Sequence, residues 1–412
     1  MLEESSWKIK NTKSYPQLAQ NIEADVVLVG AGLTGIFNAY VLSKAGLRVV
    51  VLEKNDKILE ETTLLTTAFI TQLLDTSFVE LIELFGKIKA ELVWQSGQDA
   101  IALIADIVKQ ESIDCEFKSV SAYTYAKDQS EFEELKQEYE EIKKSEFKAS
   151  LFEDGSKLNF ANSGFLEVPG QAMFHPIKFA QGLADAAESA GAKIFTNSEV
   201  LGIKKQTAIT KTGQVPATDL VIATYSPLTN EGTRFKKGMY VSYVYELEIA
   251  KGLIPEGLYL DTANPYHYFR IDSYENFDRM IVGGEDHRKG IKMNPDKNFN
   301  ALEEHIKPIL GSNNYKIMRK WTGPILEPSD GLALIGQIKP HTFVATAFSG
   351  NGMTYSALSA TIIRDLILKN KNPYISLYNP KRIPSLKQLI KKAADYAGEF
   401  FGGVLKNFFK TQ

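Results

Sequence analysis

The chain of 412 residues (45.9 kDa) exceeds the ~250–300 residues at which a single hydrophobic core stops growing, so we expect two domains. Hydrophobic residues make up 44% and charged residues 24%, which excludes a largely disordered or collagen-like protein. The formal net charge of −3 provides no basic field for nucleic acid. The single cysteine, Cys115, excludes an internal disulfide and a zinc–cysteine cluster, and the five histidines show no metal-ligand spacing.

The N-terminus and the hydropathy of the chain bear on its location. Residues 1–8 lack a basic segment followed by an apolar core, so they do not predict a signal peptide. No apolar run reaches the ~18 residues that a membrane span needs. We therefore expect a soluble, cytoplasmic protein.

The first half of the chain predicts alternating strands and helices. After a polar arm over 1–22, the β-branched run Ala24–Val29 is typical of a buried parallel strand. A glycine turn, a helix over 36–45 and a strand over 48–53 complete a βαβ unit. The elements that follow are helices over 78–111, 130–147 and 176–190 and strands over 116–126, 193–203 and 219–224.

From residue 239 the sequence pattern changes to aromatic and β-branched runs between turn signals, which predicts an antiparallel sheet. Its strands are expected over 240–247, 257–260, 266–271 and 279–284. After residue 320 short apolar strands return, followed by a helix over 353–369. The segment 384–410 is amphipathic and predicts a helix that packs on the protein body, with membrane contact as the alternative.

This order predicts an interleaved α/β (mixed α+β) fold. A discontinuous Rossmann-like dinucleotide-binding domain would carry an inserted mixed or antiparallel β-sheet as the substrate domain. The expected boundaries are an arm over 1–22, a dinucleotide-binding domain over 23–115, 161–225 and 321–372, a substrate domain over 116–160 and 226–320, and a helical tail over 373–412.

The turn after the first strand carries the clearest motif. Gly30-Ala31-Gly32-Leu33-Thr34-Gly35 fits G-x-G-x-x-G between a strand and a helix, where the helix N-terminus can bind a pyrophosphate. Glu53, followed by Lys54, ends the second strand and can accept hydrogen bonds from ribose hydroxyls. An acid at this position disfavours NADP, whereas the motif alone does not separate FAD from NAD.

Several further segments resemble the FAD-dependent oxidoreductases of the D-amino acid oxidase/glycine oxidase (DAO) family. The resemblance extends over roughly 23–385 and is greatest to the branch that often carries a C-terminal Rieske domain, which this one-cysteine chain lacks. The segments that carry it are the Thr-rich run 62–67, Phe174-His175-Pro176, Asp219–Thr224, Ile281-Val282-Gly283-Gly284-Glu285-Asp286-His287, 321–324, 330–336 and Ser349–Thr354.

The resemblance implies FAD and a set of residues that bind it. By this resemblance the further cofactor-binding residues are Thr62, Thr63, Thr66, Thr67, Val200, Ala223, Thr224, Gly350, Asn351, Gly352, Met353 and Thr354. The last five form a glycine turn before a helix. Its N–H groups and dipole would stabilise the negative charge of a reduced flavin.

Two departures from the family pattern bear on the reaction. Leu64 and Leu65 stand where many relatives have a Gly-His pair, and Cys115 is remote in sequence, so we expect non-covalent FAD. Gly323 stands where glycine oxidase-like members have a carboxylate-binding arginine, which favours an amine over an α-amino acid.

The candidate catalytic residues lie in the inserted sheet. Arg270 is the best substitute for the missing arginine, with Tyr268 and Tyr243 near it in sequence. Packing within the sheet would explain the tyrosines equally well. Glu285 and His287 fit either a supporting role or a solvent-exposed loop.

These features predict an FAD-dependent amine or amino-acid oxidase or dehydrogenase. Hydride would pass from the carbon that bears nitrogen to flavin N5, and the imine would then hydrolyse. Oxygen, a quinone or a separate carrier protein would accept the electrons. Two alternatives remain: a flavin-binding electron-transfer or partner-binding subunit without amine oxidation, and an NAD-linked or hydroxylating enzyme.

Overall fold

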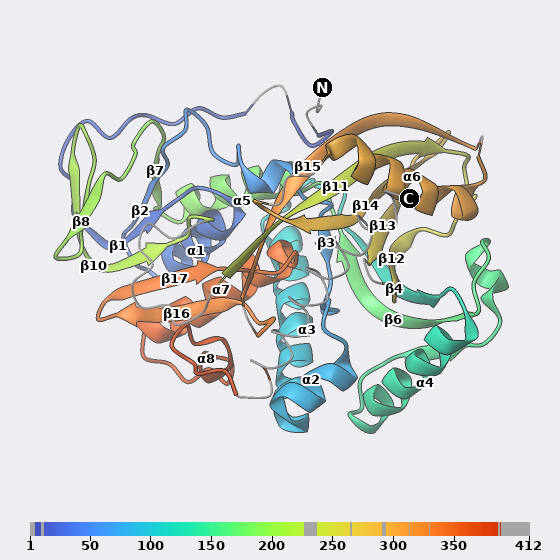
Figure 1. The fold of residues 1–412 in the computed structure, drawn as a ribbon. Helices are drawn as coiled ribbons and strands as arrows, with labels where there is room; N and C mark the ends of the chain where they lie inside the picture. The colour runs from blue at the N-terminus through green and yellow to red at the C-terminus, as the bar shows by residue number, and fades with distance from the viewer. Residues whose placement is uncertain are drawn as a thin grey trace.

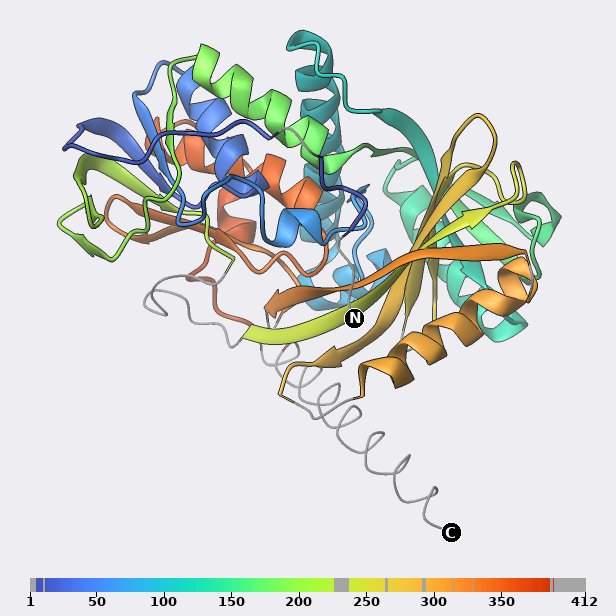
Figure 2. The ribbon, with the colours of Figure 1, turned by 90° about the horizontal axis from the view of Figure 1, so that it is seen from above.

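The computed structural model describes residues 5–385 and 388, apart from 10–11, 226–236, 264–265, 291–293, 313 and 329. Two β-sheets lie side by side, with helix α3 (Lys87–Gln110) between them (Figures 1 and 2). This is the mixed α/β fold with a Rossmann-like sheet that the sequence predicts. Most of the predicted C-terminal tail lies outside the described residues. Its first part forms the short helix α8 (Ile375–Tyr378), and Tyr378 is buried.

The first sheet is built on the predicted βαβ unit. β1 (Ala24–Val29) pairs in parallel with β2 (Val49–Leu52) and with β10 (Gln214–Ile222). Its eight strands run in the order β16-β17-β10-β1-β2-β7, with β8 and β9 as a hairpin beside β10. The remaining strands are β7 (Lys193–Phe195), β8 (Gly202–Lys204), β9 (Thr207–Ile209), β16 (Leu334–Lys339) and β17 (Thr342–Thr346).

The helices α1 (Leu33–Lys44), α5 (Pro176–Ser189) and α7 (Gly352–Ile367) pack together on one face of this sheet, and α3 packs on α7. The opposite face has its own core, which includes Val27, Val50 and Leu220. Burial on both faces explains why the strands read as continuous apolar runs.

Two predicted elements are interrupted. The helix expected over 78–111 is two helices, α2 (Phe78–Phe85) and α3, because Gly86 between them has φ of +83°. The strand expected over 193–203 is split into β7 and β8. At the break the Thr196 hydroxyl donates to the Tyr15 carbonyl of the N-terminal arm, and Asn197 has φ of +50°.

The second sheet has nine strands in the order β15-β11-β14-β13-β12-β4-β6-β3, with β5 beside β6. Their bounds are β3 (Phe69–Ile70), β4 (Lys118–Ala126), β5 (Ser150–Phe152), β6 (Gly164–Met173), β11 (Lys237–Ile249), β12 (Gly257–Asp261), β13 (His267–Ser273), β14 (Asp278–Arg288) and β15 (Tyr315–Pro328). Neighbouring pairs are antiparallel except β12 with β4. Helix α6 (Pro295–Leu310) lies along the sheet face away from the first sheet (Figure 2).

The strand β6 was missed from the sequence, since Gly164, Pro169 and Gly170 interrupt its pattern. It nevertheless pairs with β4 almost throughout, with a register shift opposite Pro169. By sheet membership, β3, β6 and all of β15 belong with the second sheet. This differs from the boundaries at 161 and 321 that we expected, so a division by sheet is the one we propose.

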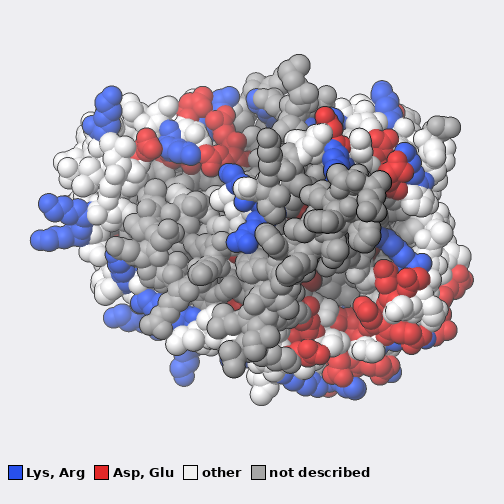
Figure 3. Space-filling model, in the orientation of Figure 1, with Lys and Arg blue, Asp and Glu red and all other residues white. Residues whose placement is uncertain are grey.

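The outer elements are mostly polar. Helix α4 (Gln129–Lys144) packs a few apolar side chains inward and exposes Glu133, Glu134 and Glu140, and acidic side chains gather at that corner of the molecule (Figure 3). Two short 3₁₀ turns, η1 (Thr62–Leu64) and η2 (Gly155–Leu158), complete the element set. Among the described residues, no helix is both long and apolar enough to cross a membrane.

Candidate functional site

A cavity of about 170 Å³, partly open to solvent, lies where the two sheets meet. One wall comes from the first sheet and its helices, and the other from strands β11, β13 and β15. The predicted residues that line the cavity are Gly32, Leu33, Thr34, Thr62, Thr63, Thr66, Thr67, Ala223, Thr224, Tyr268, Gly350, Gly352 and Met353. Four segments expected to bind a cofactor therefore meet at one place.

The glycines of the first turn allow two stretches of backbone to approach each other closely. A Cβ at position 35 would lie 1.9 Å from the Gly30 carbonyl oxygen, and Gly30 itself has φ of +102°. Gly32 is the N-cap of α1 and offers no side-chain cap. The first N–H groups of α1 are therefore presented at the cavity, an arrangement suited to an anion such as a pyrophosphate.

The predicted cofactor-binding residues that do not line the cavity are Gly30, Gly35, Glu53, Lys54, Val200, Asn351 and Thr354. The Glu53 carboxylate accepts hydrogen bonds from the N–H groups of Ala31 (2.8 Å) and Asn55 (3.0 Å), so it braces the glycine turn. Lys54 forms an exposed ion pair with Glu61 at 2.6 Å. Val200 is buried in the core on the opposite face of the sheet.

The Thr-rich loop is held by segments far away in sequence. The Thr63 hydroxyl accepts from the Leu33 N–H at 3.2 Å, which joins the loop to the start of α1. The indole of Trp7 is fully buried and donates to the Thr66 carbonyl at 2.7 Å, and the Ser5 hydroxyl donates to the Leu64 carbonyl. No motif in the sequence connects the N-terminal arm with this loop.

The two departures from the family pattern meet in space. Leu65 lines the cavity, and its carbonyl accepts from the Trp321 indole at 3.1 Å. A Cβ at Gly323 would lie 3.1 Å from the same carbonyl oxygen. Position 323 is therefore pressed against the loop and could not hold an arginine in this backbone without displacing it.

The turn before α7 provides a second helix N-terminus. Gly350, with φ of +78°, and Gly352 line the cavity, and α7 has no side-chain cap. Asn351 and Thr354 instead tie the turn to the segment after β3. The Asn351 amide donates to the Leu73 carbonyl at 2.8 Å, and the Thr354 hydroxyl donates to the Thr71 carbonyl at 2.9 Å.

Arg270 does not line the cavity. Its guanidinium is buried, pairs with the Asp272 carboxylate and donates to three backbone carbonyls, those of Thr67, Ala68 and Phe174. Arg279 binds the other side of Asp272, at 3.0 Å. With its donors engaged in this way, Arg270 holds the Thr-rich loop against the sheet and is not placed to bind a substrate carboxylate.

The two candidate tyrosines lie on opposite faces of the second sheet. Tyr268 lines the cavity, and its hydroxyl forms a hydrogen bond with the Ser242 hydroxyl at 3.1 Å. Burial raises the pKa of Tyr268, so its hydroxyl stays protonated. Tyr243 packs instead against Phe299 of α6, with ring centroids 4.9 Å apart, and is remote from the cavity.

Cys115 is buried outside the cavity lining, and burial raises the pKa of its thiol to about 12. A thiol that stays protonated is a poor nucleophile. Its placement agrees with the expectation that it does not attach the cofactor.

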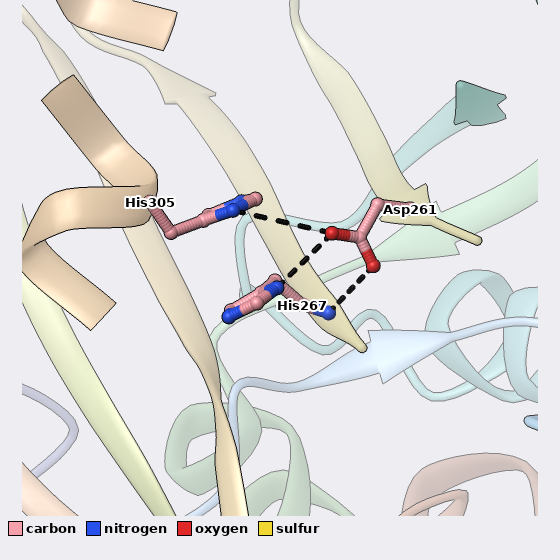
Figure 4. Close-up of side chains that lie close together, drawn as sticks. All are labelled: Asp261, His267 and His305. Carbon is pink, nitrogen blue, oxygen red and sulfur yellow. Dashed lines mark hydrogen bonds and ion pairs between the residues drawn. The ribbon is translucent and has the colours of Figure 1, made fainter. Parts of the chain in front are cut away.

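Asp261, His267 and His305 cluster between β12, β13 and α6 (Figure 4). The two imidazole rings are stacked 3.8 Å apart and nearly parallel, so their in-plane lone pairs do not converge on one ion. Lys127 already pairs with Asp261 at 2.7 Å. Burial would lower the pKa of His267, but hydrogen bonds to Asp261 and Glu285 outweigh it and raise that pKa. The group is therefore a hydrogen-bonded ion network.

Comparison with known proteins supports the reading of the cavity. The family model DAO, described as FAD dependent oxidoreductase, matches residues 25–366. The chain belongs to this family. The predicted resemblance and FAD as the cofactor are thereby confirmed.

Relatives of known name cover most of the chain. A Bacillus subtilis protein named as a Rieske 2Fe-2S iron-sulfur protein, YhfW, is 30% identical over 98% of this chain and 81% of its own length. The gamma-glutamylputrescine oxidoreductase of Escherichia coli is 22% identical over 90% of this chain and 89% of its own length. The glycine oxidase structure from Geobacillus kaustophilus, 18% identical, superposes with a TM-score of 0.74 over 88% of this chain and all of its own.

The residues of the cavity fit FAD on their own geometry. Two uncapped helix N-termini, those of α1 and α7, face one cavity that no charged side chain lines among the described residues. The first could hold the pyrophosphate and the second the N1–C2=O edge of the flavin. The Thr-rich loop supplies hydroxyl groups between them.

Proposed function

We propose that this oxidoreductase oxidises the carbon–nitrogen bond of a small amine. A hydride leaves the carbon that bears the nitrogen, and the imine product hydrolyses. When bound, FAD supplies the hydride acceptor at N5. The electron acceptor that follows, whether oxygen, a quinone or a carrier protein, is left open by the described residues.

The observation that carries the proposal is the neutral substrate-side wall. Ser242, Val244, Tyr268, Pro324 and Ile325 form it, and none of them can form an ion pair with a carboxylate. The nearest arginine along β13, Arg270, is fully engaged elsewhere. An α-amino acid would therefore find no described arginine or lysine for its carboxylate, whereas an amine needs none.

The same wall supplies what the chemistry requires of the protein. Only a neutral amine has the lone pair that assists loss of the hydride. Apolar surroundings lower an amine's pKa and so favour that form. The side chains therefore act mainly by positioning the substrate and excluding water, and no dedicated general base is needed.

The first test is a visible spectrum of the purified protein, repeated on the supernatant after denaturation. We expect a flavin spectrum that moves into the supernatant, because the attachment is predicted to be non-covalent. Flavin that stays with the pellet would overturn that prediction.

The second test is anaerobic reduction of the flavin by matched pairs that differ by one α-carboxylate. Suitable pairs are phenethylamine with phenylalanine and putrescine with ornithine. We expect the amine of a pair to bleach the flavin faster. Bleaching by NADH alone would favour the NAD-linked alternative, and no bleaching by any amine or amino acid would favour a flavin-binding subunit.

A further inference from the structure

A β-bulge in β14 directs one carboxylate toward the cavity. Tyr243 pairs with Gly284 but Val241 pairs with His287, so two residues of β14 oppose one of β11. Glu285, the first of the two, has φ of +54°. Bulges of this kind redirect side chains beside active sites.

The bulge decides which of the two neighbouring carboxylates faces the cavity, because it shifts the alternation of β14 by one residue. The Glu285 carboxylate lies 3.1 Å from His267 Nε2, within the ion network on the α6 side. Asp286 lies beside Ser242 and Tyr268, both of which line the cavity. A regular strand would have placed Asp286 with the ion network instead.

The outer end of the Tyr268 ring lies against Gly283, in the strand that carries Asp286. A Cβ at position 283 would be 2.5 Å from the Tyr268 hydroxyl oxygen, so a larger residue there would displace the ring. Tyr266 stacks on Tyr268, with centroids 5.6 Å apart and planes at 28°. Tyr266 and the Asp286 carboxylate therefore lie next to Tyr268, which lines the cavity, and the three side chains form one corner beside it.

One oxygen of the Asp286 carboxylate lacks a partner. Its Oδ1 is shielded from solvent and has no hydrogen-bond donor, and no lysine or arginine of the described chain forms an ion pair with it. Burial raises the pKa of this carboxyl to about 7; the Ser242 hydroxyl opposes that shift and the charge of Glu327 adds to it. The other charged groups near this corner are Asp75, Glu285 and His267.

We infer that Asp286, with Tyr266 and Tyr268, binds a cationic nitrogen of the substrate. This rests on the proposed function and narrows its substrate class to amines that carry a second, positively charged nitrogen besides the one that is oxidised, and no α-carboxylate. An ammonium supplies the missing donor to Oδ1, and the negative faces of two aromatic rings stabilise it further. A substrate carboxylate in the same corner would be repelled by Asp286.

The test uses the FAD-containing protein and ligands that cannot react. Benzyltrimethylammonium has no nitrogen lone pair and cannot be oxidised by the proposed route, and benzoate is its anionic counterpart. Their binding is measured as a change in the flavin absorption spectrum. We expect the wild type to prefer the cation, and Asp286→Asn to weaken cation binding at least tenfold while leaving benzoate binding unchanged or tighter.

Glu285→Gln is the matched control, because it removes the same charge one residue away on the opposite face. We expect it to change cation binding less than twofold. Equal binding of the cation by wild type and Asp286→Asn would overturn the inference, as would a wild type that prefers benzoate or binds neither ligand. A wild type that prefers benzoate, or that binds neither ligand, overturns the inference even if the variant does not fold.

The inference and the proposed function fail in different ways. If amines still reduce the flavin but cation binding does not depend on Asp286, only the role of Asp286 is removed. If cation binding depends on Asp286 but no amine reduces the flavin, the proposed oxidation is removed and a cation-binding site remains.

Discussion

Arg270 on β13 and Asp286 on β14 are charged residues in the same sheet, yet their surroundings are opposite. Arg270 meets a carboxylate and three backbone carbonyls, so its donors are used within the protein. Asp286 has one oxygen with no donor. A buried charge with all its partners serves the fold, whereas one that lacks a partner is available to a ligand.

The largest loss of stability should follow from removing the charge of Arg270, whose donors are all used within the protein. Arg270→Met leaves the carbonyls of Thr67, Ala68 and Phe174 without donors and Asp272 with Arg279 alone. Breaking a buried pair from one side costs about 3–5 kcal/mol. We expect that loss in denaturant unfolding, together with release of flavin at lower temperature.

Arg48→Met is the control, because Arg48 forms an exposed ion pair with Asp25 and its loss should change stability far less. A variant of Arg270 with wild-type stability but weakened benzoate binding would contradict this account. It would restore Arg270 to the role of a carboxylate-binding residue.

The second prediction concerns the glycine beneath Tyr268. In Gly283→Ala the new methyl group would meet the Tyr268 ring, whose outer end can move, so we expect a stability cost of about 1–3 kcal/mol. The displaced ring should weaken binding of benzyltrimethylammonium. Gly202→Ala, at an exposed position of β8 where no atom lies within 4 Å and φ is not positive, separates this effect from a general cost of replacing glycine. Unchanged cation binding would show that Tyr268 takes no part.

The sequence was informative where function depends on backbone. The glycine turns at 30–35 and 350–352, the Thr-rich loop and the strand before Ala223 were assigned to one cofactor site, and they line one cavity. Their motifs carry the signal because glycine is required by conformation and close approach.

The charged residues of the inserted sheet were harder to assign. Arg270 was chosen for its type, but its partners come from residues 67, 68 and 174, which no local pattern connects. Asp286 was present in the Gly-Gly-Glu-Asp-His motif, yet its direction depends on a bulge. The orientation of a strand side chain reverses with a one-residue shift, so it cannot be read from the motif alone.

The third prediction tests the arm that the sequence left unassigned. The buried Trp7 indole lies 5.3 Å from Arg270 and 4.7 Å from Arg279, measured from the ring centroid to each guanidinium carbon. Trp7→Phe keeps an aromatic face but removes the donor to the Thr66 carbonyl. We expect a loss of about 1 kcal/mol and a several-fold faster release of flavin. Flavin release at the wild-type rate would mean that the arm does not hold the loop.

The smallest change in stability is expected for Asp286→Asn, and it should be a gain where the other variants lose stability. In the unfolded chain the Asp286 carboxyl ionises near pH 4, whereas its raised pKa in the folded protein opposes that ionisation. The wild type therefore loses stability relative to Asp286→Asn as pH rises from about 4 to 7, and the difference stays constant above that. Because the side chain is only half-buried, we expect the variant to gain roughly 1 kcal/mol at pH 8 and almost nothing at pH 4. Thermal unfolding at the two pH values measures this, with Glu285→Gln as the control that should show no such gain. A variant less stable than the wild type at pH 8 would reveal a cation already paired with Asp286, and the contrast with Arg270 would then disappear.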